Sequence, residues 1–420
     1  MYKMKKILVV VESINVNDSS ASKGRVALIK NLKKCNYDIK VYHYTRKDIS
    51  IQGIPCVAIK EKKVTFLAIV NKLQLIFYKL TKIRLSKYYE MLTGFSFSFL
   101  NDAKSIKAAL KNEKDFNPDF VLTLSKAASF TAHKAILGIP KWHSKWLAYV
   151  HDPYPFHFYP RPYNWVEPGY HKKQEFFREV SKKSAHGVFP SQLLKEWMGS
   201  YYPDFLERGI VIPHQIQDEE VTNKVLPNYF SKEGFTILHA GNLMLPRNPK
   251  GLIEGYKEFL KNNKEAKKDT QLLFIGSNEA FNEYLNHEKN NLEQLYVSKG
   301  YVQYNEVQIM QMNASINVIL EAKAEISPFL PGKFPHCIKA DKPILHLGPQ
   351  MSETSRLLGE DYKYKSQIDD TQKIAQHIEE LYQKWKNDKY NHLNRPDLVD
   401  YLSIKNLKTV MNSLSSDASS

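Results

Sequence analysis

Short apolar runs alternate with amphipathic helical patterns along most of this chain, and this alternation constrains the fold more than any other feature. Runs such as Lys6–Val11 and Phe120–Leu124 are long enough for buried strands but too short for helices. Between such runs, apolar residues recur at the three- and four-residue spacing of a helix, as over residues 23–35. Buried strands that alternate with helices are typical of a parallel α/β sheet.

The predicted elements fall into two successive series, separated by a polar, acidic connector at residues 217–233. We therefore expect two doubly wound domains, residues 1–214 and 230–390, followed by a helix within residues 395–414. In the first series, strands are expected at residues 6–11, 38–44, 55–59, 120–124, 146–151, 187–190 and 209–213, and helices at 23–35, 103–111, 168–183 and 192–201. In the second, strands are expected at 235–240, 270–276, 317–321 and 343–347, and helices at 249–262, 306–312 and 371–385.

Composition and cysteine spacing favour a cytoplasmic protein. The apolar fraction of 43% and the charged fraction of 25% are ordinary for a protein with buried cores. Cys35, Cys56 and Cys337 lie far apart and form neither a CxxC pair nor a disulfide framework, as expected in a reducing compartment. The first apolar run ends at Glu12 without a cleavage site, which predicts a strand rather than a signal peptide. No run reaches the roughly 18 apolar residues of a transmembrane helix.

The positive charge is concentrated in the first half of the chain. Residues 1–214 contain 35 Lys and Arg against 17 Asp and Glu, whereas the remainder contains 25 against 27. Such asymmetry favours a polyanionic partner for the first half, either nucleic acid or an anionic membrane surface.

Residues 60–92 combine an apolar stripe with a basic one. Two interpretations stay open: a helix that lies peripherally in the headgroup layer at the inner face of the cell membrane, or a helix packed on its own domain with a solvated basic face. The apolar residues at helical spacing are Phe66, Ile69, Val70, Leu73, Ile76, Phe77, Leu80 and Ile83. The basic residues are Lys60, Lys62, Lys63, Lys72, Lys79, Lys82, Arg84 and Lys87.

The strongest local pattern lies in the second half, at residues 321–343. A buried strand ends at Glu321, a loop rich in Pro and Gly follows, and a short helix is predicted after Lys333. Backbone N–H groups in such a loop and at such a helix start suit a diphosphate. The ammonium of Lys333 would add a mobile cation for the same phosphates.

This arrangement resembles the donor-binding segment of the retaining GT-B glycosyltransferases, in the large family four group. In that family a proline- or glycine-rich loop, a phosphate-gripping basic residue, a glutamate and a Lys-Pro strand entry recur in this order. The second series opens in a similar way, with a strand, the Gly241 loop, Arg247 and a helix that carries Leu252-Ile253-Glu254. The resemblance implies two Rossmann-like domains that face each other across a cleft, with a final helix that returns to the first domain.

The resemblance also implies an activity. A sugar would pass from a nucleotide-sugar donor to a hydroxyl of a glycan or lipid-linked acceptor, in cell-envelope polysaccharide or glycoconjugate synthesis. Retention of the anomeric configuration is expected, without a metal ion and without a cofactor other than the nucleotide-sugar co-substrate. The first domain would bind the acceptor and the second the donor, with Arg247 and Lys333 on its diphosphate. The donor-binding set is Gly241, Asn242, Arg247, Lys250, Ser327, Gly332, Lys333 and His336.

The sequence departs from the family pattern at two places. When Lys342-Pro343 is aligned with the family's Lys-Pro, Pro328 and His336 stand where the family has two glutamates separated by seven residues. His336 is therefore a candidate to replace a donor contact. Residues 20–25 stand where other members often have a double glycine. These departures leave open a catalytically inactive GT-B-like protein that binds a partner.

In the first half, His151 and Asp152 end a predicted strand, at the edge where ligands bind in such sheets. Enzymes of the resembled type often have a histidine near the transferred sugar at this place, and a neighbouring carboxylate could tune its basicity. We therefore take both residues as catalytic candidates. In the alternative interpretation, His151 bonds backbone at the strand end and Asp152 caps a turn with Pro153.

Other classes of function find less support in the sequence. Zinc-ligand spacing, a Ser-His-Asp order and a Walker loop are all missing, which argues against metallohydrolases, esterases and P-loop ATPases. A nucleic-acid-binding protein would use the basic first half, but its cations are interspersed with apolar helix positions and match no such motif. We expect neither a metal site nor a nucleic-acid partner.

Overall fold

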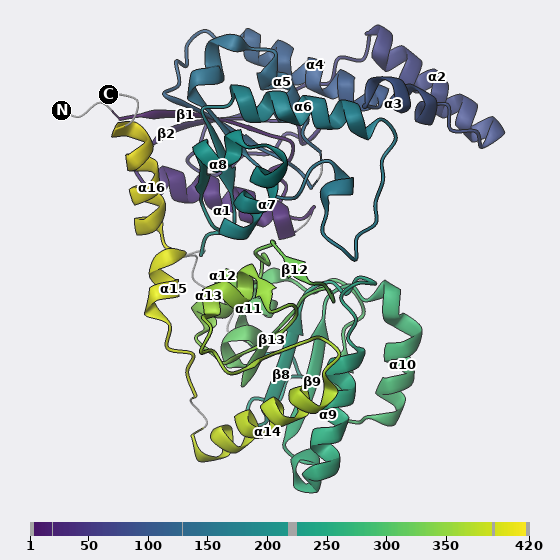
Figure 1. Ribbon diagram of the computed structural model, residues 1–420, viewed down its shortest axis with the longest axis vertical. Helices are drawn as coiled ribbons and strands as arrows, with labels where there is room; N and C mark the ends of the chain where they lie inside the picture. Colours follow the sequence, from purple (N-terminus) through teal and green to yellow (C-terminus); the bar gives the residue numbers. More distant parts are fainter. Residues whose placement is uncertain (1–3, 19, 128, 217–224, 389–390, 417–420) are drawn as a thin grey trace. The chain divides into compact units, whose positions relative to one another are not determined.

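The computed structural model describes residues 4–18, 20–127, 129–216, 225–388 and 391–416 (Figure 1). The chain divides into two compact units. The first contains the residues up to Tyr159, Tyr163–Gln215 and the C-terminal segment from Ile404, and the second contains Pro160–Pro162 and Ile216–Ser403. Each unit is built on one large parallel sheet with helices around it. This is the α/β architecture that the alternating pattern predicts.

All seven strands of the first sheet run parallel, in the order β3-β2-β1-β4-β5-β6-β7. In the centre of the sheet, Ile7 of β1 lies opposite Ile39 of β2 and Phe120 of β4. Central strands are buried on both faces, as a parallel sheet requires, because helices cover both. The strands are β1 (Lys6–Val11), β2 (Asp38–His43), β3 (Cys56–Ala58), β4 (Phe120–Leu124), β5 (Trp146–Tyr149), β6 (His186–Phe189) and β7 (Gly209–Val211).

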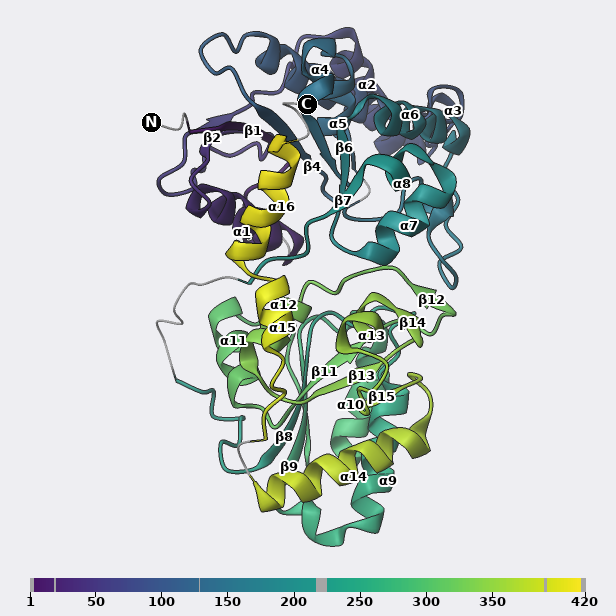
Figure 2. The same cartoon turned by 60° about the vertical axis from the view of Figure 1, so that its left-hand side comes forward.

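Alternate residues of β1 belong to the two cores of the first unit. Leu8 and Val10 pack into a core with side chains of α4, α5 and α6, while Ile7 and Val9 pack on the other face with α1 and α16. Both views show α16 beside α1 (Figures 1 and 2). The helices of this unit are α1 (Ser20–Lys34), α2 (Phe66–Thr81), α3 (Ser86–Thr93), α4 (Phe97–Lys111), α5 (Thr131–Leu137), α6 (Tyr170–Lys183), α7 (Gln192–Tyr201), α8 (Asp204–Arg208) and α16 (Ile404–Ser416), with 3-10 turns at Pro140–Lys145 and Phe156–Phe158.

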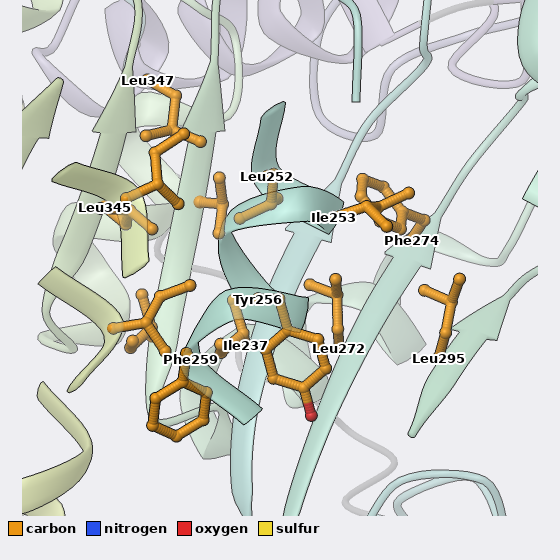
Figure 3. Packing of buried hydrophobic residues seen from close by; sticks show 14 of the residues in the cluster. Ile237, Leu252, Ile253, Tyr256, Phe259, Leu272, Phe274, Leu295, Leu345 and Leu347 are labelled. Carbon is orange, nitrogen blue, oxygen red and sulfur yellow. The ribbon is translucent and has the colours of Figure 1, made fainter. Parts of the chain in front are cut away.

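The second sheet has six parallel strands in the order β10-β9-β8-β11-β13-β15. On one face, α9 and α14 pack over the sheet, and side chains such as Tyr256 and Phe259 of α9 meet Ile237 and Leu272 of the strands (Figure 3). Gly255 of α9 permits close packing of α9 against α14, since a Cβ there would lie 2.6 Å from Cγ2 of Ile374 on α14.

The elements of the second unit complete the fold. The strands are β8 (Phe235–Ala240), β9 (Thr270–Ile275), β10 (Leu295–Val297), β11 (Ile316–Leu320), β13 (Ile344–Leu347) and β15 (Lys365–Ser366), with a separate short pair β12 (Ile326–Ser327) and β14 (Met351–Ser352). The helices are α9 (Lys250–Asn262), α10 (Asn282–Asn291), α11 (Tyr304–Asn313), α12 (Phe334–Ala340), α13 (Glu353–Leu358), α14 (Thr371–Asn387) and α15 (Pro396–Tyr401), with 3-10 turns at Lys264–Lys267 and Glu279–Phe281.

Several elements differ from the sequence-based expectation. The edge strands β10 and β15 were not predicted, because two or three residues give too little periodicity to detect. The helix expected within residues 395–414 is two helices: α15 belongs to the second unit and α16 to the first. Part of the expected connector, residues 217–224, lies outside the described residues. Among the described residues, no helix is long and apolar enough to cross a membrane.

The side chains that α16 buries predict that this C-terminal helix stabilises the first unit. Leu407 is 1% exposed and packs in the core with residues of β1 and α1. Leu407→Ala should therefore lower the free energy of unfolding of the first unit by about 2–5 kcal/mol. Denaturant unfolding measures this, with exposed Asn412→Ala on the same helix as control. Equal loss in both variants, or none in either, would contradict this role for α16.

Candidate functional site

The carboxyl ends of β8 and β9 come together without side chains between them. Gly241 follows β8 with φ +149°, and Gly276 follows β9 with φ +133°. A Cβ on Gly276 would lie 2.7 Å from the carbonyl oxygen of Gly241, so the backbones touch at this point. The backbone N–H of Ser277 donates to Oδ1 of Asn242 at 3.1 Å, which fixes the loop after β8. The second sheet therefore ends in a tight backbone corner.

The side chain of Lys333 reaches this corner from the start of α12. Its Nζ lies 2.9 Å from Nε2 of His239, a buried residue of β8. A Cβ on Gly241 would lie 2.9 Å from the same Nζ. Glycine is favoured at position 241 because its φ of +149° lies in a region that L side chains rarely adopt, and the mobile end of Lys333 fills the adjacent space. The resemblance implies that Gly241 belongs to the donor-binding set, and its nearest contact in the structure is with Lys333.

Burial perturbs the titration of both groups. Desolvation by burial is the main cause that lowers the pKa of Lys333 to about 7; Arg247 acts in the same direction, and Cys337 and Glu321 act against it. Desolvation also holds the pKa of His239 well below its ordinary value, with Lys333 and Arg247 adding to the effect. The neutral imidazole therefore accepts the hydrogen bond from Lys333. Two cations, Lys333 and Arg247, share this corner with the neutral imidazole, and an anion placed there would relieve the repulsion between the cations.

A buried acid, Glu321, lies directly after β11. Glu321 is 4% exposed, and its Oε1 lies 2.8 Å from Nε2 of His346. The hydroxyl of Ser327 donates to its other oxygen. Burial by itself would raise the pKa of Glu321, but the hydrogen bonds from His346 and Ser327 outweigh it and hold the pKa below its ordinary value. Ser327, expected among the donor-binding residues, therefore has its hydroxyl engaged inside the protein.

The other expected donor-binding residues of the second unit have varied surroundings. Asn242 is exposed next to the corner, and Gly332 is exposed just before Lys333. Lys250 begins α9 and lines a pocket with Asn248, Lys323 and Asp369, among others. His336, on α12, approaches the hydroxyl of Tyr304 on α11 at 3.1 Å.

These positions place four of the eight expected residues together and two elsewhere, while Lys250 lines its own pocket and Gly332 precedes Lys333. Gly241, Lys333 and Arg247 come together at the corner, with Asn242 in the same loop. Ser327 and His336 instead contact residues of the protein interior or of a neighbouring helix. No group of three His, Cys, Asp or Glu side chains within the described ranges is arranged to hold a metal ion.

In the first unit, His151 and Asp152 lie just beyond the end of β5, as the sequence predicts. Nδ1 of His151 is 3.0 Å from the hydroxyl of Ser125, and its ring stacks on Tyr149 at 4.2 Å. Desolvation, together with the nearby charge of Arg25, keeps the pKa of His151 well below its ordinary value. The imidazole is therefore neutral at physiological pH. Asp152 is hydrogen-bonded to Tyr159.

Arg25, whose charge acts on His151, and Glu12, whose carboxyl is near Arg25, were not among the residues expected from the sequence. Arg25 is 1% exposed, and it donates to the carbonyls of Ser13 and Ser125 at 3.4 and 3.1 Å, which joins the ends of β1 and β4. Oε1 of Glu12 accepts from the backbone N–H of Thr131 at 3.2 Å, and desolvation raises the pKa of Glu12 to about 7. A charged residue directly after a buried central strand, as Glu12 is, was the signal that would have found this cluster.

The chain is similar to known proteins in its fold rather than in its sequence. No protein-family model matches the sequence, and no curated protein sequence matches it. Among solved structures, a glycosyltransferase from Rickettsia africae superposes with a TM-score of 0.64 and 14% sequence identity, over 98% of each chain. The fold is GT-B. The two Rossmann-like domains predicted from the sequence are thereby confirmed.

Two further structures with the GT-B fold match over nearly their full lengths. Anabaena HepE, solved in complex with UDP and glucose, has a TM-score of 0.58 at 11% identity, over 98% of this chain and all of that one. An α,α-trehalose-phosphate synthase (UDP-forming) from Burkholderia vietnamiensis has a TM-score of 0.62 at 9% identity, over 98% of this chain and 96% of that one. These likenesses extend across both units.

The lowered pKa of Lys333 predicts that this lysine destabilises the unliganded protein at neutral pH. Between pH 7 and 10.5 the unfolded chain binds a proton that the folded chain lacks, so stability rises with pH by up to about 1.4 kcal/mol per pH unit. Lys333→Met should be more stable than the wild type at pH 7, and the difference should shrink toward pH 9. Guanidinium unfolding across this range measures it.

The exposed Lys232→Met serves as the matched control, because it removes a lysine of the same unit that water already solvates. Its stability relative to the wild type should stay constant over the same pH range. A constant difference for Lys333→Met as well would mean that Lys333 titrates normally.

Proposed function

We propose that this protein is a glycosyltransferase that takes a sugar from a nucleotide-sugar donor. The observation that carries the proposal is the ammonium of Lys333, held against Gly241 and His239 at the carboxyl end of the second sheet with Arg247 nearby. Ligands of α/β sheets bind at this edge. Solved GT-B structures support the choice of ligand, since HepE was crystallised with UDP-glucose.

The chemistry follows from the charge of the leaving group. As the bond from the sugar to the diphosphate breaks, negative charge grows on the phosphate oxygens. Lys333 and Arg247 would neutralise it together with backbone N–H groups of the non-proline residues among 327–333. Because these groups are desolvated in advance, they need little reorganisation during the reaction. Phosphate binding would raise the pKa of Lys333 back toward its ordinary value, so the lysine is fully charged when it is needed. We propose that this transfer needs no metal ion.

The first unit would bind the acceptor. A neutral His151, hydrogen-bonded to Ser125 and close to Asp152, would accept a hydrogen bond from the acceptor hydroxyl or orient the sugar. We propose that the reaction retains the anomeric configuration, without a covalent intermediate on the protein. The acceptor would be a glycan or a lipid-linked saccharide of the cell envelope, modified in the cytoplasm.

A second candidate is a GT-B protein that binds nucleotide sugar without turnover. It is favoured by the hydrogen bonds that engage Glu321, the buried glutamate directly after β11, with His346 and Ser327 inside the unit. It is also favoured by His336 and Pro328 at the positions of the family's two glutamates. Hydrolysis or transfer of a nucleotide sugar by the purified protein decides between the two candidates.

Calorimetric titration of UDP tests the donor site. Loss of one charge-assisted contact to a phosphate costs about 1.5–3 kcal/mol, so Lys333→Ala and Arg247→Ala should each weaken binding roughly ten- to a hundredfold. The double variant should lose less than the sum, because the two cations act on one diphosphate. Lys232→Ala should bind as the wild type does. Equal affinity in the wild type, both single variants and the double variant would refute the proposed donor site.

Turnover of UDP-glucose separates the role of His151 from donor binding. His151→Ala should lower the rate of sugar transfer or donor hydrolysis by about 10²–10⁴-fold, while its affinity for UDP stays unchanged. His171→Ala, an exposed histidine of the same unit, is the control and should retain the wild-type rate. A rate for His151→Ala within a few-fold of the wild type would leave the imidazole with the structural role of bonding Ser125.

A further inference from the structure

The helix α2 packs on the first unit with its more polar side and exposes its most apolar side. It has no buried residue. Its contact with α4 uses one side of the helix, where Leu67, Gln74 and Tyr78 are half-buried. On the opposite side, Phe66 is 78% and Leu80 is 81% exposed. An amphipathic helix normally buries the apolar side, so α2 is reversed relative to a core-facing helix.

The exposed apolar surface continues through the turn after α2 and along α3. Thirteen of the twenty-five large apolar side chains exposed among the described residues lie in residues 64–92. We call these thirteen exposed side chains the apolar face. Its members beyond the two above are Val64, Ile69, Leu73, Leu75, Ile76, Phe77, Ile83, Leu85, Tyr88, Met91 and Leu92. Surface patches of this kind mark interaction sites. Figure 1 shows α2 and α3 at the margin of the first unit, with α2 extending outward from it.

Basic side chains border the apolar face. Lys72 and Lys79 are exposed and follow one line along α2, roughly 40–60° around the helix from Ile76. Lys60, Lys62, Lys63, Lys82, Arg84 and Lys87 flank the two ends of α2, while Glu61 and Glu90 are the only acids in residues 60–92. A surface that combines exposed apolar side chains with a cationic border requires an occupant that is apolar inside and anionic at its boundary.

We propose that the apolar face docks on an anionic lipid bilayer, with α2 lying in the plane of the headgroups. Phe66, Leu73 and Leu80 would enter the acyl boundary, and Lys72 and Lys79 would lie among the lipid phosphates. A second copy of the chain fits less well, since it would bring the same cations against each other. Nucleic acid would pair with the cations and leave the apolar side chains in water. The docking stands independently of the proposed sugar transfer.

The helix is held in place before any lipid is present. The hydroxyl of Thr65, which also caps the first turn of α2, lies 2.6 Å from Oδ1 of Asn101 on α4. Nδ2 of Asn101 donates to the carbonyl of Lys62 at 3.1 Å, and the backbone N–H of Lys62 donates to Ser105. These bonds fix the start of the helix on α4. Binding would therefore avoid the ordering cost that an unfolded amphipathic segment incurs.

Co-sedimentation of the full-length protein with vesicles tests the proposal. Wild type should bind phosphatidylcholine vesicles that contain phosphatidylglycerol at least tenfold more tightly than phosphatidylcholine alone, and salt should weaken that binding. Leu73→Gln with Leu80→Gln should reduce binding at least tenfold at low and high salt. Lys72→Glu with Lys79→Glu should reduce it similarly at low salt. All four positions are exposed, so these variants should fold as the wild type does.

The matched control is Lys33→Glu with Lys114→Glu, which makes the same change in charge at exposed positions of the first unit outside the apolar face. It should bind vesicles as the wild type does. A Leu73→Trp variant reports insertion when it is compared with the wild type, which has five tryptophans of its own: only the variant should gain emission that shifts to the blue with anionic vesicles. Equal binding by all variants, or no binding by the wild type, would overturn the proposal. So would a dimer in sedimentation equilibrium without lipid that the Leu73→Gln, Leu80→Gln variant abolishes.

Discussion

Parallel pairing of buried strands is the constraint on which the rest of this structure depends. In both units every ladder of the main sheet is parallel, so all strands of a sheet end at the same edge. The loops that follow the strands at that edge lie outside the sheet ladders, so polar side chains can occupy them. Lys333, Arg247 and His239 meet at the edge of the second sheet, and Arg25 lies near both His151 and Glu12 at the edge of the first.

Desolvation at these edges determines what the charged groups can do. A lysine whose pKa falls to about 7 is held at a cost to stability, and a glutamate whose pKa rises to about 7 likewise. Such groups gain most from a ligand of opposite charge or from a proton. Glu321 is the contrasting case, because hydrogen bonds from His346 and Ser327 satisfy its charge internally. Lys333 therefore belongs to a site that can bind an anion, whereas Glu321 belongs to a polar cluster inside the protein whose charge is already satisfied.

The apolar face is exposed to water, unlike the apolar side chains of the two cores of the first unit. Leu8 and Val10 are buried because helices cover the sheet, whereas Leu73 and Leu80 remain in water on a helix that is already anchored to α4. Exposure of this kind contributes nothing to folding, since burial of apolar surface is what stabilises the folded state. The apolar side chains of α2 therefore need an explanation outside the folded monomer, and an anionic bilayer supplies one.

The sequence alone determined the fold class and the position of most central elements. The limits of β1, β4, β8 and α7 agree with those expected from periodicity, because buried strands and amphipathic helices differ in repeat length. The placement of His151 at a strand end and of Lys333 at a helix start followed from the same reasoning. Only the tertiary structure decided which residues meet. Contacts between Lys333 and Gly241, between Arg25 and Ser125, and between α16 and α1 join segments far apart in the chain. The direction in which α2 turns its apolar side was also undecided, since periodicity gives the spacing of a stripe but not its partner.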